Sequence, residues 1–367
     1  MRRVSKVAVV AVTGALALTA TACGSKPKSE SNSTPSASAG AGGGASGTKV
    51  KACMVTDTGG IDDRSFNASA WQGLQQAQKE LGADVKYVTS KSENDYVPNL
   101  DSLVKENCTV IVAVGGLMAD ATTQSAKNNP NQKYLIIDSS SVGNNVKGLE
   151  YNTAQAAFLG GYLAAAQSQT GKVATFGGKK IPPVTIYMDG FVEGVKYYNQ
   201  VKGKNVQVLG WDEAKQDGSM AEKFDSPADG ERIANDFIAQ GADVIHPVAG
   251  QTGLGAASAA SKSNGKASIL WVDVDGYQSA EQYKNVMLST VTKGIADSVF
   301  KAIQETGQGQ YNTQPYLGTL QNGGVGLAPY HDFDSKVSAQ TKQEIDQLKQ
   351  DIISGKIPIT SPAQPKS

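Results

Sequence analysis

Short apolar runs alternate with amphipathic stretches from about residue 50 onwards, and this alternation predicts the fold class. In the first part of the chain, the predicted strands span 50–55, 84–88, 110–114 and 134–138, and the predicted helices span 65–81, 95–106 and 120–127. The strands are short apolar runs with turn residues at their ends. Such a strand–helix repeat predicts a parallel sheet with helices on both faces.

The same alternation begins again after about residue 152. The predicted strands span 173–177, 206–211, 244–248 and 268–272, and the predicted helices span 158–169, 192–200, 231–240 and 256–263. A further strand at 286–291, a helix to about 305 and a C-terminal helix near 335–353 follow. Two successive α/β units with a returning segment indicate two lobes joined by several crossings.

Polar and glycine residues stand at the predicted strand ends, namely Asp57, Gly115, Asp138, Asp212, Gly250 and Asp273. Ligands of open α/β sheets bind outside the carboxyl ends of the strands, so two facing lobes would form one binding cleft. The alternative is that these residues only cap helices and form turns. That explanation suits any one of them better than it suits all six together.

The N-terminal residues are typical of an exported protein. A basic segment at 2–6 precedes an apolar run at 7–18, which is too short to span a bilayer. Ala20–Ala22 then lead directly to Cys23, which is similar to the junction of a bacterial lipoprotein. We expect a lipoprotein signal peptide over 1–22 and acylation of Cys23. The alternative is an ordinary signal peptide that happens to be cut near a cysteine.

The segment after Cys23 predicts a tether. Residues 24–47 are almost all Ser, Gly, Ala, Pro, Lys, Asn and Thr, without an aromatic residue or Val, Ile or Leu. Such a segment has no apolar surface whose burial could offset the entropy of ordering. We therefore expect 23–48 to be an acylated cysteine with a disordered linker, and the folded domain to span 49–367.

Composition and charge exclude several function classes. The chain has 34 basic and 34 acidic residues and no net charge, which gives no indication of a nucleic-acid partner. Only Cys53 and Cys108 remain after Cys23, and in an exported protein they form either one disulfide or two buried thiols.

The polar residues do not predict an enzyme. Only two histidines are present, and neither His246 nor His331 stands beside a nucleophile in a recognisable elbow. His246 lies within a predicted strand and is interpreted as a core residue. The adjacent carboxylates Asp62 and Asp63 precede a helix and suit its positive end. We therefore expect no catalytic residue, metal or cofactor; a secreted nucleoside hydrolase is the enzymatic alternative.

Several segments carry a resemblance to one family. The most specific is Asp57–Asn67 (DTGGIDDRSFN) with the following Trp71-Gln72-Gly73, and the others, in the same order as in the family, are Gly115-Gly116, 189–194, 249–255, 271–275 and 289–293. They resemble the basic membrane protein family, the purine nucleoside receptor A-like substrate-binding lipoproteins of ABC transporters. This sequence departs from the family at Trp271, where a small residue is usual, and over 212–225, which is longer and more polar.

The resemblance implies the type I periplasmic-binding-protein fold, with two Rossmann-like lobes joined by three crossovers. Lobe 1 would comprise about 49–152 and 292–318, and lobe 2 about 153–285 and 319–360. The implied function is capture of a small ligand, a purine nucleoside, and its delivery to a membrane permease and its ATPase. We expect a monomer held at the outer face of the membrane by its lipid alone. A sugar or other solute sensor without transport is the alternative.

A nucleoside requires flat apolar surfaces for its base and polar groups for its base edge and ribose. Phe66 opens a helix after a polar loop and is our candidate for one stacking ring. By resemblance the opposite ring is Phe224, with Phe191 as its rival. Core packing is the alternative for each of the three phenylalanines.

The polar candidates come from strand ends and from the loop–helix junction beside Phe66. Asp57, Asn67 and Asp138 would contact the base, while Asp273 and, by resemblance, Lys293 would contact the ribose. Glycine allows the backbone to approach a ligand closely. The candidates of this kind are Gly115, Gly250 and Gly253.

Overall fold

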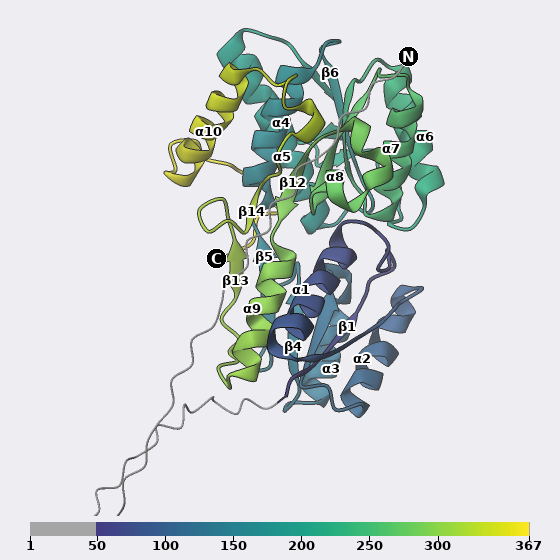
Figure 1. Ribbon diagram of the computed structural model, residues 1–367, viewed down its shortest axis with the longest axis vertical. Helices are drawn as coiled ribbons and strands as arrows, with labels where there is room; N and C mark the ends of the chain where they lie inside the picture. Colours follow the sequence, from purple (N-terminus) through teal and green to yellow (C-terminus); the bar gives the residue numbers. More distant parts are fainter. Residues whose placement is uncertain (1–48, 367) are drawn as a thin grey trace, which may run out of the picture. The chain divides into compact units, whose positions relative to one another are not determined.

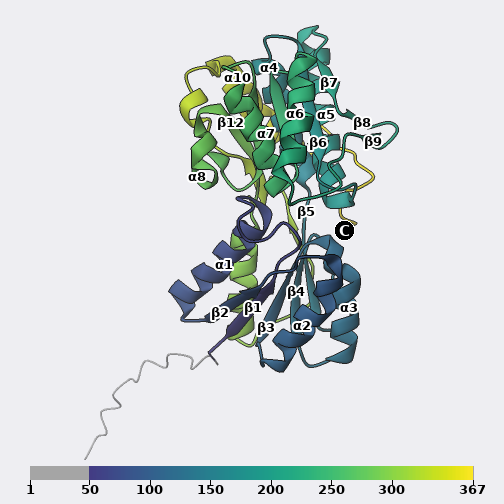
Figure 2. The same cartoon turned by 90° about the vertical axis from the view of Figure 1, so that its right-hand side faces the viewer.

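The computed structural model describes residues 49–366. The predicted signal peptide, Cys23 and the tether lie outside the described residues. The described chain forms two α/β lobes, each a six-stranded sheet flanked by helices (Figures 1 and 2), which confirms the predicted fold class. None of the helices in this part of the chain combines the length and the apolar character that crossing a membrane requires.

The first lobe is built on a fully parallel sheet with the strand order β13-β5-β4-β3-β1-β2. Its strands are β1 (Lys51–Val55), β2 (Asp84–Val88), β3 (Val110–Val114), β4 (Lys133–Ile137), β5 (Val146–Tyr151) and β13 (Tyr316–Gly318). Its helices are α1 (Phe66–Leu81), η1 (Glu93–Asp95), α2 (Tyr96–Lys105), η2 (Gly116–Met118), α3 (Ala119–Asn128) and α9 (Ile295–Gly307). β3 is buried along its whole length, as expected for a strand covered by helices on both faces.

The second lobe repeats this plan with the strand order β14-β12-β11-β10-β6-β7. Its strands are β6 (Lys172–Gly177), β7 (Gln207–Leu209), β10 (Val244–Val248), β11 (Ser268–Asp273), β12 (Met287–Lys293) and β14 (Val325–Leu327), and only β14 is antiparallel. Its helices are α4 (Thr153–Gln167), α5 (Pro182–Lys202), α6 (Pro227–Ala239), α7 (Gln251–Lys262), α8 (Gly276–Ser279), η3 (Glu281–Val286), η4 (His331–Phe333) and α10 (Ala339–Ile353). A small hairpin of β8 (Trp211–Asp212) and β9 (Asp217–Gly218) extends from it.

The chain crosses between the two sheets three times, after β5, after β12 and after β13. The second crossing lies at Gly294, because β12 remains paired with β11 as far as Thr292 and with β14 as far as Lys293. The sequence pattern did not reveal β5, β13 and β14, each of which lies beside a crossing. β13 and β14 have only three residues each, too few for a period to be recognised.

Close packing of α4 on α5 forms much of the second lobe's interior. A Cβ atom on Gly161 would lie 2.0 Å from the carbonyl oxygen of Phe191, and one on Gly194 would lie 2.0 Å from that of Phe158. Only glycine permits this approach. The small residues within the predicted helix 158–169 are therefore explained by the second helix that lies directly on it.

Cys53 and Cys108 form a disulfide in the first lobe, with their Cα atoms 6.0 Å apart. Cys53 lies within β1, and Cys108 shortly precedes β3, the strand paired with it. Of the two states that the sequence allowed, the structure contains the bonded one.

We expect removal of this disulfide to destabilise the first lobe. A crosslink over 55 residues restricts the unfolded chain, and such bonds typically contribute about 2–4 kcal/mol to the free energy of unfolding. Urea denaturation of the Cys53→Ala/Cys108→Ala variant should show a loss of this size. Titration of the unreduced wild-type protein in denaturant should find neither thiol free; two reactive thiols would contradict the bond.

Candidate functional site

The strand orders define one site in each lobe before any side chain is considered. In the first sheet the chain order reverses between β1 and β3, and in the second it reverses between β6 and β10. Loops that leave two neighbouring strands in opposite directions open a crevice at such a switch point, where ligands of α/β sheets bind. Asp57 and Gly115 follow β1 and β3, whereas Gly178 and Gly250 follow β6 and β10.

A cavity of about 560 Å³, including its mouth, lies where the two switch points meet. The first lobe contributes Asp57, Gly59, Asp63, Phe66, Asn67, Gly115, Gly116, Leu117 and Asp138 to the wall. The second lobe contributes Ile181, Pro183, Val184, Tyr187, Phe224, Val248, Ala249, Gly250, Val272, Asp273 and Lys293.

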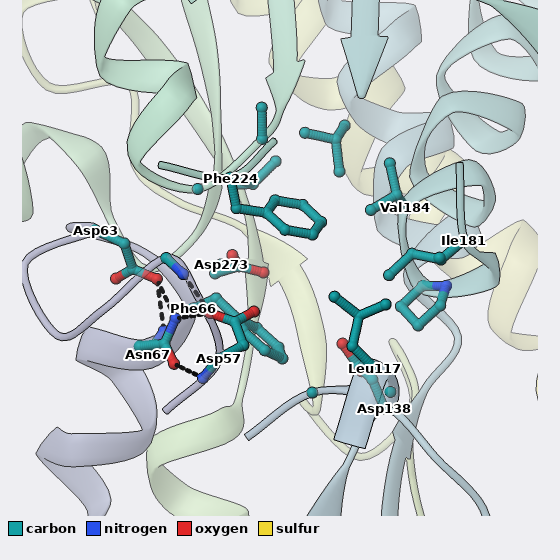
Figure 3. A pocket seen from close by; sticks show the side chains of 18 of the residues that line it. Asp57, Asp63, Phe66, Asn67, Leu117, Asp138, Ile181, Val184, Phe224 and Asp273 are labelled. Carbon is teal, nitrogen blue, oxygen red and sulfur yellow. Dashed lines mark hydrogen bonds between the residues drawn. The ribbon is translucent and has the colours of Figure 1, made fainter. Parts of the chain in front are cut away.

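Two aromatic rings, Phe66 and Phe224, enter the cavity from opposite lobes (Figure 3). Each ring is backed by a glycine. A Cβ on Gly115 would lie 3.3 Å from the Phe66 ring, and a Cβ on Gly178 would lie 2.3 Å from the Phe224 ring. Gly115 also has a φ of 115°, which L side chains rarely adopt. Because these glycines have no side chain, each ring can approach the backbone closely.

Asp57 and Asn67 are held together at the first-lobe side of the cavity. The Asn67 Nδ2 donates to Oδ1 of Asp57 at 2.7 Å, and the Asp57 backbone N–H donates to Oδ1 of Asn67 at 3.1 Å. The backbone N–H of Gly59 also donates to Oδ1 of Asp57, at 2.8 Å. Among the described residues no group donates to Oδ2 of Asp57, so this oxygen is available to a ligand.

Asp63 fixes the start of the helix that carries Phe66 and Asn67. Its carboxylate accepts from the backbone N–H groups of Ser65, Asn67 and Ala68 at 2.7–3.0 Å, and from Nδ2 of Asn67 at 3.0 Å. These N–H groups otherwise have no partner at a helix N-terminus. The predicted interaction of the acidic pair with the helix end is therefore made by Asp63, whereas Asp62 is exposed.

Two further carboxylates occupy equivalent places in the two lobes. Asp138 follows the fourth strand of the first sheet and Asp273 ends the fourth strand of the second, and both have positive φ, 62° and 68°. Oδ2 of Asp138 lies 2.6 Å from Nζ of Lys293, and Oδ1 of Asp273 accepts from the Tyr187 hydroxyl at 2.8 Å. Each again keeps one oxygen without a partner among the described residues.

Burial dominates the electrostatics of this cavity. It raises the pKa of Asp57, Asp63 and Asp273 to about 6 each, against the lowering effect of their hydrogen bonds. Burial also raises the pKa of Asp138, and Lys293 opposes that shift. Asp57, Asp138 and Asp273 each keep an oxygen without a donor among the described residues, and a ligand with hydroxyl or N–H groups would stabilise their charged forms.

Lys293 lies among three aromatic rings as well as beside Asp138. Its Nζ is 4.9 Å from the ring centroid of Phe66, 5.2 Å from that of Tyr151 and 5.7 Å from that of Tyr187. Its side chain is 2% exposed. A buried ion pair of this kind contributes little net stability.

The structure brings together the predicted ligand-binding residues at this cavity, except Phe191 and Gly253. Phe191 is fully buried and stacks on His246, with ring centroids 5.2 Å apart, so its expected place at the ligand is corrected to the core. Burial lowers the pKa of His246 to about 4, in keeping with a core histidine.

Two other expectations are also corrected. Asp212 belongs to the β8–β9 hairpin and forms an exposed ion pair with Lys215, because the predicted strand over 206–211 ends early at Leu209. Gly253 faces the ring of Trp271, from which a Cβ would be 3.1 Å away, and is not part of the cavity wall.

The sequence analysis missed Tyr187 and the apolar wall of Ile181, Pro183 and Val184. We expected the helix to begin at 192, but α5 begins at Pro182. The Pro182-Pro183 pair was the available signal, since proline is favoured in the first turn of a helix. Beginning the helix there would have placed Tyr187 in its second turn, near the strand ends.

The described residues contain no group of three or more His, Cys, Asp or Glu side chains arranged to hold a metal ion.

Comparisons with known proteins agree with this geometry. Residues 50–362 match the Bmp family model, described as ABC transporter substrate-binding protein PnrA-like. The chain is 32% identical over 332 residues to the ABC transporter nucleoside-binding protein BmpA of Lactococcus lactis, covering 86% of this chain and 90% of that one. It is 31% identical over 312 residues to an uncharacterized lipoprotein of Pyrococcus furiosus, covering 83% and 75%.

A solved structure extends the similarity to the fold. The crystal structure of an ABC transporter solute-binding protein from Aeropyrum pernix matches with a TM-score of 0.77 and 26% identity, covering 85% of this chain and 94% of that one. The family match extends over nearly the whole described chain and includes every residue of the cavity wall. The chain therefore belongs to the Bmp family of PnrA-like substrate-binding proteins of ABC transporters.

Proposed function

We propose that this protein is an extracytoplasmic lipoprotein that captures a purine nucleoside between its lobes and delivers it to an ABC-type permease. The observation that carries the proposal is the pair of glycine-backed rings, Phe66 and Phe224, which enter one cavity from opposite lobes beside carboxylates with unused oxygens. The Lactococcus relative is named as a nucleoside-binding protein, which supports the same ligand class.

The base would lie between the two rings. Stacking on an aromatic side chain contributes about 1–3 kcal/mol per base and requires only a flat π-face. Beside Phe66, the free Oδ2 of Asp57 would accept an N–H from the base edge, while Asn67 holds the other oxygen in place. The ligand would therefore carry both a flat π-face and hydrogen-bond donors along its edge.

The ribose would meet the opposite side of the cavity. Asp273 is oriented by Tyr187, and its second oxygen would accept from a ribose hydroxyl. Lys293 would donate to a ribose oxygen while Asp138 holds its ammonium group. Hydrogen bonds to charged groups contribute about 1.5–3 kcal/mol each, so ribose recognition would add substantially to stacking.

We assign the protein no reaction step and propose that it works as a monomer. A sugar-binding protein or a sensor without transport is the alternative, and a free sugar lacks the flat base that two facing rings suit. The proposed lipid anchor rests on the Ala20–Cys23 junction and on the Pyrococcus relative, which is named as a lipoprotein. Such an anchor would keep the binding protein beside its permease.

Phe66→Ala should weaken nucleoside binding by about ten- to a hundredfold, because it removes one stacking surface. Calorimetric titration with inosine would measure the change. Phe300→Ala is the matched control, since Phe300 is a half-buried phenylalanine of α9 in the same lobe and is not part of the cavity wall. Equal effects of the two substitutions would contradict a stacking role for Phe66.

The ligand class is tested by titrating the protein with inosine, its free base hypoxanthine, and ribose. We expect inosine to bind most tightly. In Asp273→Asn, the amide oxygen can still accept from Tyr187, but the charged acceptor for ribose is lost. Inosine should then bind about ten- to a hundredfold more weakly, whereas hypoxanthine should change less than threefold. Parent-like binding of both ligands would refute the ribose assignment, and tight binding of ribose alone would favour the sugar alternative.

Mass spectrometry of the protein isolated from membranes should find the mature N-terminus at Cys23 carrying acyl chains. Cys23→Ser should release the protein into the medium or abolish its processing, because a serine oxygen cannot replace the thioether-forming sulfur. An unmodified N-terminus at another residue would exclude the anchor and leave the ordinary signal peptide.

A further inference from the structure

One backbone carbonyl of the first lobe is bound by two side chains of the second lobe. The carbonyl oxygen of Arg64 accepts from the Trp271 indole N–H at 3.3 Å and from the Ser279 hydroxyl at 2.8 Å. Arg64 has a positive φ of 58°, which is unusual for a residue with a side chain. In this conformation the Arg64 carbonyl reaches Trp271 and Ser279, which lie on the other side of the cleft.

Trp271 is a rigid donor. Its ring is fully buried, and it fills the space left by two glycines: a Cβ on Gly276 would be 2.7 Å from the ring, and one on Gly253 would be 3.1 Å away. Trp271 also lies two residues before Asp273 on β11. The indole N–H and the carboxylate of Asp273 are therefore set by one element.

The loop held by these donors is the one that forms the first-lobe wall of the cavity. Arg64 stands between Asp63, which anchors the start of α1, and the ring-bearing Phe66. Asp57, at the beginning of the same loop, is tied to Asn67 in the first turn of α1. A shift of the Arg64 carbonyl relative to β11 would therefore move Phe66 and Asp57 relative to Asp273.

We propose that the Arg64 carbonyl is the docking point of the closed form, and that Trp271 and Ser279 are positioning residues that hold the Phe66 loop against the second lobe. Their hydrogen bonds can form only when the lobes are together. They stabilise the closed cavity whether or not it contains ligand, and they slow its opening when it does.

Another polar contact between the lobes is of a different kind. Lys179 Nζ lies 2.6 Å from Oε1 of Glu93, and the two side chains are 27% and 52% exposed. Exposed ion pairs contribute little and are screened by salt. The contact to Arg64 involves uncharged donors, so the closed population should persist at high ionic strength.

The direct test needs no ligand. Spin labels at Gln75→Cys in α1 and Asn235→Cys in α6, both exposed positions, in a Cys23→Ser background would report the distance between the lobes. We expect a short-distance population in the ligand-free protein at 0.5 M salt. Trp271→Phe/Ser279→Ala should reduce the ratio of closed to open molecules by at least fivefold, since each hydrogen bond removed corresponds to about a two- to tenfold change.

Trp211→Phe is the matched control. The Trp211 indole N–H also donates to an oxygen, Oδ1 of Asp189 at 2.8 Å, but within the second lobe. It should leave the distance distribution unchanged even where it lowers stability. If the double variant does not fold, Ser279→Ala alone removes the shorter of the two bonds from a half-buried position and serves the same test. An unchanged ratio in a folded Trp271/Ser279 variant would overturn the proposal.

A kinetic test uses inosine and rests on the proposed function. In stopped-flow experiments, Trp271→Phe/Ser279→Ala should raise the dissociation rate of inosine about three- to thirtyfold and change its association rate less than threefold. A general loss of structure would not produce that split. Failure of the wild-type protein to bind inosine would refute the nucleoside proposal, while the spin-label distances would still decide whether Arg64 is a docking point. An unchanged dissociation rate would overturn the docking role.

Discussion

The carboxyl ends of the strands in both sheets face a single cavity, and every other feature of the site depends on this arrangement. In each sheet the chain order reverses beside the first strand, so the loops after β1 and β3, and after β6 and β10, diverge and leave a crevice. Each crevice contains one phenylalanine lying on a glycine, Phe66 on Gly115 and Phe224 on Gly178. The site is thus a doubled structure, in which two similar half-sites face each other.

This doubling also explains the carboxylates. Asp138 and Asp273 follow equivalent strands and have the same left-handed backbone conformation, which aspartate tolerates better than most residues. The half-sites are completed differently: Asp138 has an ion pair with Lys293, whereas Asp273 has a hydrogen bond from Tyr187. A ligand that bridges the two half-sites therefore meets a charged pair in one and a carboxylate with a neutral partner in the other.

Burying these groups is costly for the empty protein. Desolvation raises the pKa of Asp57 and Asp273 to about 6, a shift that disfavours the charged form despite the hydrogen bonds from Asn67 and Tyr187. Polar ligand groups that donate to the unused oxygens would offset this desolvation. A ligand without donors would leave these buried acceptors without partners.

Much of the site could be predicted from the strand ends, because ligands of α/β sheets bind outside the carboxyl ends of the strands. Asp57, Gly115, Asp138, Gly250 and Asp273 were predicted on that basis and line the cavity. Helical residues were harder. Tyr187 and Phe191 are four residues apart on the same face of α5, and both rings lie beside His246, at 6.0 and 5.2 Å. The two residues differ only in their position along α5, which places Tyr187 at the cavity and Phe191 in the core. That position could not be predicted without knowing where α5 begins.

Trp271 shows why the contacts across the cleft could not be predicted. It is a buried residue in a strand, and nothing in its neighbours along the chain indicates that its N–H would meet a carbonyl 207 residues away in sequence. Such contacts also affect how far a ligand can shift the equilibrium between the open and closed forms. A ligand shifts the lobes only by its differential affinity for the closed form. Each hydrogen bond between Arg64 and the second lobe lowers the free energy of the closed form. The ligand then has to supply less of the free energy of closure, so more of its binding free energy appears as affinity.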